Sequence, residues 1–382
     1  MSEFDSIRAY REEEFPQKLR ELLDDRDFIR AMDSFIGWLQ RRIILHTAGR
    51  CSNVEELQEK AVVPIVGKAL KKQGCTLTAD FSSMPSITGQ CVFISNHRDI
   101  VLDPTLLAYL LITNGGKGMG IAIGDNLLIH PWIENLVRLN RSFIVKRSIA
   151  SQSEFLDFSR LLSAHIHDII SSGSHQVWIA QREGRAKDSN DLTQRSLLKM
   201  LSMSGGNDVV QSLKALHITP LAISYEYDPC DWLKTMEFQM KRDNPDYVKT
   251  RDNDLLNMRT GISGHKGRVH FQTAACIDSL IDGLDRSLPR NILLDTIAGN
   301  IDRGIHSCYR IYPCNRIAMD MLQNDTAQAG YYTEEDRTIF ENYMEKQLSK
   351  ITLRNPDMDF LRTKFLEMYA NPLMNHLKAM QS

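Results

Sequence analysis

The chain has 382 residues, 42% hydrophobic and 25% charged, a composition typical of a globular protein with one large domain and an accessory domain, or with two domains. Its formal net charge of −2 gives no overall basic field that would attract nucleic acid, so a site for an anionic ligand requires local clusters of Arg and Lys. Apolar runs stay below the ~18 to 20 residues that span a bilayer, so any action on lipids is expected from the membrane surface.

The N-terminal sequence MSEFDSIRAYREEEF is polar and acidic and lacks the basic and apolar regions of a secretory signal. The seven cysteines are scattered without CxxC spacing, and several lie in apolar segments, as reduced structural thiols commonly do. These two features predict a cytoplasmic protein.

From Glu12 to about Lys72 the pattern predicts helices. Within residues 27–45, apolar side chains recur every three or four positions and form one helical face. We favour packing of this face on its own domain; because Trp38, Arg41 and Arg42 lie near it, contact with an anionic membrane is the alternative. The apolar face consists of Phe28, Ile29, Met32, Phe35, Ile36, Leu39 and Ile43.

Past a Ser-, Gly- and Pro-rich loop at 79–90, short β-branched runs alternate with helix-length segments such as 155–171. This alternation predicts an α/β fold, with a mixed, largely parallel sheet covered by helices on both faces. From about Leu280 onward only helices are expected. The predicted organisation is an N-terminal helical region (1–80), an α/β domain (81–278) and a C-terminal helical region (279–382). The expected strands are 91–95, 119–124, 142–146, 177–181, 220–226 and 268–271.

Polar clusters follow several of these strands, at the sheet edge where open α/β folds place their chemistry. The first cluster, SNHRDIVLD, contains His97 and nearby aspartates. A carboxylate that fixes the imidazole tautomer leaves the other ring nitrogen free to take a proton from a substrate hydroxyl. The alternative to this catalytic role is a structural one: a helix begins near Ile100, His97 caps it, and Asp99 is its N-cap residue.

Two further clusters are basic, and converging cations suggest a phosphorylated ligand. RSFIVKRS supplies Lys146 and Arg147, and QREGRAKD supplies Arg185 and Lys187 around Gly184, a residue that permits close approach of the backbone to a ligand. Taken singly, the first could be a charged edge strand and the second a solvated turn.

In order along the chain, four blocks resemble the glycerolipid acyltransferase superfamily, which acylates glycerol-3-phosphate or lysophosphatidate. They are NHRDIVLDP (96–104), GDNLLIHPWIENLVRLNRSFIVKR (124–147), VWIAQREGRAKD (177–188) and ITPLAISYE (218–226). The long second block and the preceding helical region are nearer to the glycerol-3-phosphate enzymes than to the lysophosphatidate enzymes.

The resemblance implies that His97, oriented by Asp103, acts as a general base, although five residues separate the two where the family has four, so Asp99 is a rival partner. It implies further that Arg147, Lys146, Arg185 and Lys187 bind the acceptor's phosphate. It also implies that Glu183, Gly184 and Pro220 belong to the substrate site.

The resulting expectation is an enzyme, peripheral to the inner face of the cell membrane, that moves a fatty acyl group from acyl-CoA or acyl-carrier protein to glycerol-3-phosphate without a metal, a cofactor or a covalent intermediate. A lysolipid acceptor is the first alternative. A non-catalytic scaffold that binds lipid or phosphate is the second.

Overall fold

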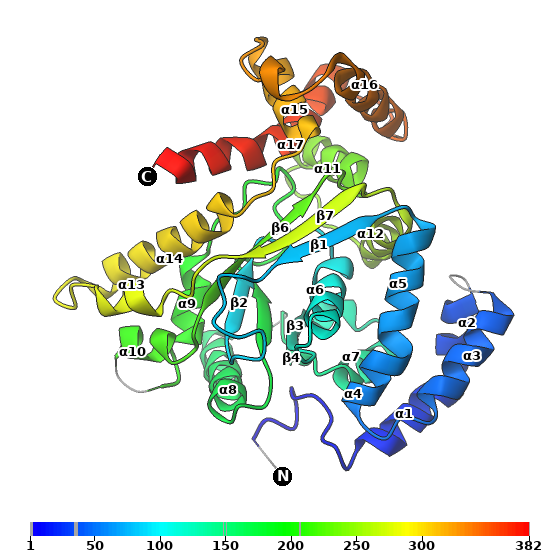
Figure 1. Cartoon of the computed structure of the whole chain (residues 1–382), viewed down its shortest axis with the longest axis vertical. Coiled ribbons are helices and arrows are strands. Elements are labelled where there is room, and N and C mark those ends of the chain that lie inside the picture. Colours follow the sequence, from blue (N-terminus) through cyan, green and yellow to red (C-terminus); the bar gives the residue numbers. More distant parts are fainter. Residues whose placement is uncertain (1–2, 34–36, 148, 150, 206–207, 382) are drawn as a thin grey trace.

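The computed structural model describes residues 3–33, 37–147, 149, 151–205 and 208–381. At its centre lies a seven-stranded sheet in the order β1-β7-β6-β2-β5-β3-β4 (Figure 1). Neighbouring strands are parallel except β6 and β7, which run antiparallel. The strands are β1 (Thr76–Asp80), β2 (Val92–Ser95), β3 (Gly120–Gly124), β4 (Phe143–Val145), β5 (Val177–Ala180), β6 (Thr219–Tyr225) and β7 (Arg268–Thr273).

Helices cover both faces of the sheet, which confirms the predicted fold class (Figure 1). Side chains of β2 alternate between two cores: Val92 and Ile94 pack against one set of helices, and Phe93 packs against the other. The first set is α8 (Gln152–Ser171), α9 (Arg195–Leu201), α10 (Val209–Lys214), α13 (Asp278–Asp282) and α14 (Arg290–Ser307). On the opposite face the second core contains residues of α5 (Val63–Lys72) and α6 (Leu102–Thr113).

All six expected strands are present within a residue or two of the predicted ends, and β1 is an additional strand. Its burial alternates weakly between exposed and half-buried positions, so the five residues carry little apolar pattern. Pairing with β7 makes β1 part of the sheet although it lies inside the predicted N-terminal helical region. The boundaries at 80/81 and 278/279 stay predictions.

The N-terminal region is helical as expected, but a single continuous helix over 27–45 was wrong. One helix ends at Asp33 and the next begins at Trp38, after Gly37 in extended conformation, a residue that disfavours helix interiors. Two residues of the expected apolar face, Phe35 and Ile36, lie outside the described part of the chain. The helices are α1 (Phe15–Asp24), α2 (Arg26–Asp33), α3 (Trp38–Ala48), α4 (Val54–Leu57), the π-helical η1 (Gln58–Val62) and α5.

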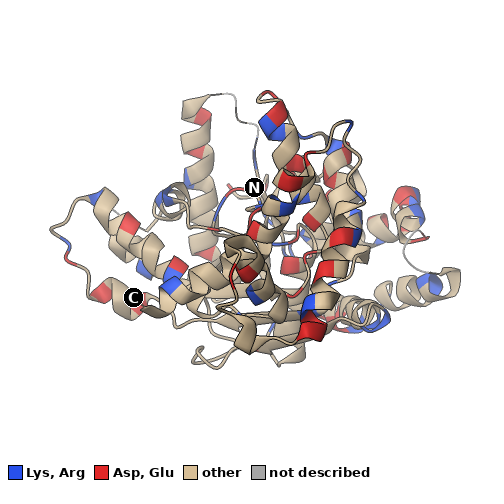
Figure 2. Cartoon of the chain, turned by 90° about the horizontal axis from the view of Figure 1, so that it is seen from above, with Lys and Arg blue, Asp and Glu red and all other residues tan. Residues whose placement is uncertain are grey.

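Within the C-terminal region, α14 packs on the sheet, whereas the last three helices pack around a core of their own, which Figure 1 shows at the end of the molecule opposite α1–α3. These three helices are α15 (Pro313–Gln323), α16 (Glu334–Leu348) and α17 (Met358–Gln381). No helix in the described ranges is both long enough and apolar enough to cross a membrane. In Figure 2, basic and acidic residues are interspersed over the helices, as the small net charge suggests.

Candidate active site

His97 lies in the loop that follows β2, at the edge where β2, β3, β4, β5 and β6 all end. The preceding residue, Asn96, anchors this loop to β6. Its side-chain amide donates to the backbone carbonyl of Ile223 at 2.9 Å and accepts from the Ile223 amide at 2.8 Å. This bidentate contact fixes the start of the loop and therefore the position of His97.

Asp103, in the first turn of α6, is the carboxylate that contacts the histidine. Its Oδ2 lies 2.8 Å from His97 Nδ1 and also accepts the backbone N–H groups of Arg98 at 2.6 Å and Asp99 at 3.0 Å. The Asp103 side chain is fully buried. Three donors on one carboxylate oxygen hold the ring in place, so Nε2 is the nitrogen left for a substrate.

The rival aspartate, Asp99, has a different position. Its Oδ1 accepts the backbone N–H groups of Val101 at 2.9 Å and Leu102 at 2.8 Å, which caps the start of α6. Burial, together with the charge of Asp103, raises the pKa of Asp99. The structure thus places Asp103 on the histidine and Asp99 on the helix terminus.

His97 opens onto a large cavity of about 1330 Å³. Drug-sized ligand pockets usually measure ~300 to 1,000 Å³, so the space exceeds what glycerol phosphate requires. Apolar side chains from α1, α2, α3, α6 and α7 (Pro131–Leu139) form much of its wall, among them Leu23, Met32, Leu45, Tyr109, Trp132 and Ile133. Much of the cavity wall is therefore apolar and suited to an acyl chain.

Five of the predicted site residues beyond His97 line this cavity: Glu183, and four that offer positive charge or an accessible backbone, Arg147, Gly184, Arg185 and Lys187. Gly184 has a positive φ of 67°, a conformation that favours glycine. Arg185 donates to Asn257 Oδ1 at 3.1 Å, while its Nη1 is buried without a hydrogen-bond partner. Such a buried donor is available to a ligand oxygen.

Glu183 and two other predicted site residues differ from these four residues in position or in pairing. Glu183 lines the cavity but is exposed and pairs with Arg147 at 2.6 Å, so its carboxylate neutralises part of the basic site. Lys146 does not line the cavity, and its ammonium lies 5.7 Å from the centre of the Phe158 ring. Pro220 is buried in β6 on the side facing α14, where its ring limits the space beside Gly304.

Sequence reasoning missed the cations that α11 (Asp231–Asp243), α12 (Arg251–Ser263) and the segment between them contribute. Lys241, Lys249 and Arg259 line the same cavity, next to the apolar Leu255 and Met258. None of the three follows a strand, so the strand-end criterion could not find them. The nearest signal in the sequence was the helical spacing of Leu255, Met258 and Ile262, which gives α12 an apolar face.

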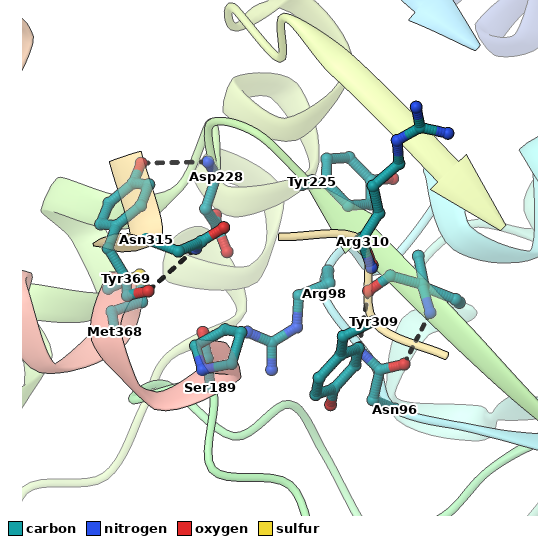
Figure 3. A pocket seen from close by; sticks show the side chains of 13 residues that line it. Asn96, Arg98, Ser189, Tyr225, Asp228, Tyr309, Arg310, Asn315, Met368 and Tyr369 are labelled. Carbon is teal, nitrogen blue, oxygen red and sulfur yellow. Dashed lines mark hydrogen bonds between the residues drawn. The ribbon is translucent and has the colours of Figure 1, made fainter. Parts of the chain in front are cut away.

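On its other side, the loop is held by a compact cluster of paired charges, the Arg98 cluster, defined here as Arg98, Asp191, Asp228 and Lys234. The Arg98 guanidinium bonds to Ser189 and Asp191, and Lys234 bonds to Asp228 and, at 2.9 Å, to the Arg98 carbonyl. Figure 3 shows Arg98 beside Ser189 and Tyr309 and the hydrogen bond between Asp228 and Tyr369. The space enclosed here is only about 30 Å³.

Among the described residues, one group of three side chains could hold a metal ion: His217, Cys276 and Asp278. His217 precedes β6 and Cys276 follows the antiparallel β7, so the group lies at the sheet edge opposite His97. It is not part of the cavity.

Comparison with known proteins supports the assignment to an enzyme class. An acyltransferase family model matches residues 52–224, slightly less than half of the chain. No curated protein matches the chain. Among solved structures, a similar one is the 1-acyl-sn-glycerophosphate (LPA) acyltransferase PlsC from Thermotoga maritima, with 9% identity, a TM-score of 0.37, and coverage of 75% of this chain and 93% of that one.

The segment matched by the family model contains His97, Asp103, Arg147 and the 182–187 turn. The same segment carries three of the four blocks in full and most of the fourth. Over this segment, which lies within the α/β fold, the chain is similar to the acyltransferase family.

Proposed function

We propose that the protein transfers a fatty acyl group from an acyl thioester to the hydroxyl of glycerol-3-phosphate. The observation that carries the proposal is the His97–Asp103 pair at the junction between cations and a large apolar cavity. His97 Nε2 takes the proton of the acceptor hydroxyl while the oxygen of that hydroxyl attacks the thioester carbonyl carbon. Collapse of the tetrahedral intermediate expels the thiolate, and the imidazolium then donates its proton to the thiolate.

In this mechanism Asp103 keeps the imidazole in the required tautomer and stabilises the imidazolium that forms. Arg147 and Arg185, with Lys187 at their border, bind the acceptor's phosphate and hold the hydroxyl in line with the thioester. Such positioning can supply several kcal/mol of the rate enhancement. None of these steps requires a metal or a covalent intermediate with the protein.

A lysolipid acceptor is the second candidate, because the apolar volume could take a chain from the acceptor as well as from the donor. Two purified proteins, wild type and His97→Ala, are given labelled acyl-CoA or acyl-carrier protein with glycerol-3-phosphate and, separately, with lysophosphatidate. We expect faster product formation with glycerol-3-phosphate and a fall in kcat of at least ~10³-fold in His97→Ala.

The matched control is His265→Ala, since the exposed ring of His265 contacts Tyr227 and does not line the cavity. It should retain wild-type turnover. Faster acylation of lysophosphatidate would assign the protein to the lysolipid enzymes. Absence of product from both acceptors would overturn the proposal and favour a non-catalytic scaffold.

The proposal includes action at the inner face of the cell membrane through α3. Trp38, Leu39 and Ile43 are more than half exposed there, and Arg42 is exposed beside them, a combination that suits an anionic lipid surface. Co-sedimentation with anionic vesicles should fall when Trp38 and Ile43 are replaced by Ser. Equal sedimentation of wild type and variant would mean that α3 does not contact the membrane.

A further inference from the structure

Three lysines from separate segments meet around one carboxylate at the edge of the cavity. Lys187 Nζ lies 2.9 Å and Lys241 Nζ 3.3 Å from Glu237 Oε1. Lys249 acts on the same carboxylate electrostatically and pairs with Asp254. We call Lys187, Lys241 and Lys249 around Glu237 the lysine cluster.

The lysine cluster holds more positive than negative charge. Its three ammonium groups face two carboxylates, those of Glu237 and Asp254, and the guanidinium groups of Arg185 and Arg259 line the same cavity. Five cations and two carboxylates leave three positive charges in this part of the wall. An anionic ligand would relieve the mutual repulsion of these cations.

The ionisation of the cluster agrees with this charge count. Burial lowers the pKa of Lys187, and the charges of Lys241 and Arg185 act in the same direction. Although burial acts to raise it, the pKa of Glu237 lies below its ordinary value because of Lys187 and the other two lysines. Glu237 therefore stays ionised and holds the ammonium groups beside the cavity.

All three lysines of the cluster line the cavity, as does α12, which begins two residues after Lys249. Leu255, Met258, Arg259 and Ile262 line the cavity from successive turns of this helix. At Gly261 the helix approaches the His97 loop so closely that an added Cβ would lie 2.0 Å from Asp99 Oδ2. The helix that carries Arg259 is thus packed against the loop that carries the proposed base.

We propose that Lys241, Lys249 and Arg259 bind the phosphate of the acyl donor's phosphopantetheine arm, a group that coenzyme A and acyl-carrier protein share. This inference rests on the proposed function. Glycerol-3-phosphate brings one phosphate, to which the proposed function assigns Arg147, Arg185 and Lys187, so Lys241, Lys249 and Arg259 are in excess of what the acceptor needs. The cavity volume leaves room for a donor arm beside the acceptor.

The proposal is tested first by binding, without any acceptor. Coenzyme A, 4′-phosphopantetheine and pantetheine, which lacks phosphate, are titrated by calorimetry into wild type and a Lys241→Gln/Lys249→Gln double variant. We expect the Kd of coenzyme A and of 4′-phosphopantetheine to rise at least ~10-fold in the double variant, because two charge-assisted contacts to the arm's phosphate are lost. The affinity for pantetheine should be the same in both proteins.

The matched control is Arg251→Gln, which removes one positive charge two residues after Lys249, at an exposed position that does not line the cavity. It should bind coenzyme A as the wild type does. Equal loss of affinity in Arg251→Gln and the double variant would mean a general charge effect and would overturn the site.

Turnover then distinguishes the sources of the phosphate and separates this inference from the proposed function. The double variant should raise the KM of acyl-CoA or of acyl-carrier protein ~10-fold and leave the KM of glycerol-3-phosphate and kcat unchanged. A raised KM for whichever donor the wild type uses supports the site. A raised KM for glycerol-3-phosphate alone, or an unchanged donor KM, overturns it. Weakened coenzyme A binding in a protein that acylates neither acceptor would uphold the site and overturn the proposed function.

Discussion

His97 and Arg98 are neighbours in the chain, yet their side chains enter opposite kinds of environment. His97 lines a cavity of about 1330 Å³, whereas Arg98 lies in a cluster of paired charges and borders a space of only about 30 Å³. On the cavity side, cations outnumber carboxylates; in the Arg98 cluster, Arg98 and Lys234 are matched by Asp191 and Asp228. The comparison indicates that one side of the loop is fixed so that the other can meet substrates.

The largest expected effect separates the two aspartates of the loop. Asp103→Asn should lower kcat ~10³-fold, equivalent to about 4 kcal/mol, because an amide no longer holds the imidazole in the required tautomer. Asp99→Asn should change kcat only a few-fold, since its amide oxygen can still accept the N–H groups of Val101 and Leu102. Steady-state kinetics of both variants provides the measurement, and a greater loss in Asp99→Asn would contradict the assigned pairing.

The Arg98 cluster should respond in stability more than in substrate affinity. Lys234→Met leaves the buried Asp228 without its closest cation and should lower the free energy of unfolding by about 3 to 5 kcal/mol. Urea unfolding measures this, with the exposed Lys199→Met as control. A loss below about 1 kcal/mol would mean that Arg98 alone compensates Asp228.

A pH effect is expected where the C-terminal helices contact this cluster. Burial raises the pKa of Asp231 to about 7, and Oδ2 of this residue accepts hydrogen bonds from Tyr343 at 2.7 Å and Tyr369 at 2.8 Å. Since the folded pKa exceeds the ordinary value of ~3.9, the proton stabilises the fold below pH ~4, and this contribution is lost as the pH rises to about 7.

Asp231→Asn tests this by removing the titrating group. The difference in free energy of unfolding between wild type and variant should shift against the wild type by up to a few kcal/mol between pH 4 and 7, then level off. Chemical denaturation at several pH values measures it. A difference that is constant with pH would show that Asp231 does not titrate in this range.

The smallest effect is expected on the cavity side. Arg147→Gln should raise the KM of glycerol-3-phosphate ~10-fold with little change in kcat, because it removes one cation from the proposed phosphate site. Its paired Glu183→Gln should leave this KM unchanged or lower it, since the carboxylate competes with the phosphate for Arg147. A lower KM for glycerol-3-phosphate in Arg147→Gln would mean that the acceptor's phosphate does not bind at Arg147.

Local patterns in the sequence predicted most of the fold. The apolar β-branched runs located six strands, because a strand buried on both faces has few other compositions open to it. The polar edge strand β1 and the break between α2 and α3 were missed, since neither changes the local apolar pattern. Both depend on partners elsewhere in the chain.

The sequence by itself determined that His97 follows a buried strand and that basic turns follow other strands. Since parallel strands bring their carboxyl ends to one edge of the sheet, these residues were expected to lie near one another. Only the tertiary structure decided which aspartate contacts His97, since the helix start places Asp99 and Asp103 in different directions. It also decided that Arg147 faces the cavity while Lys146 does not, and that lysines about fifty residues beyond the last basic turn join the same wall. These outcomes depend on how α6 packs on the sheet and how α11 and α12 contact the His97 loop, and such packing is fixed by side chains that are distant in sequence.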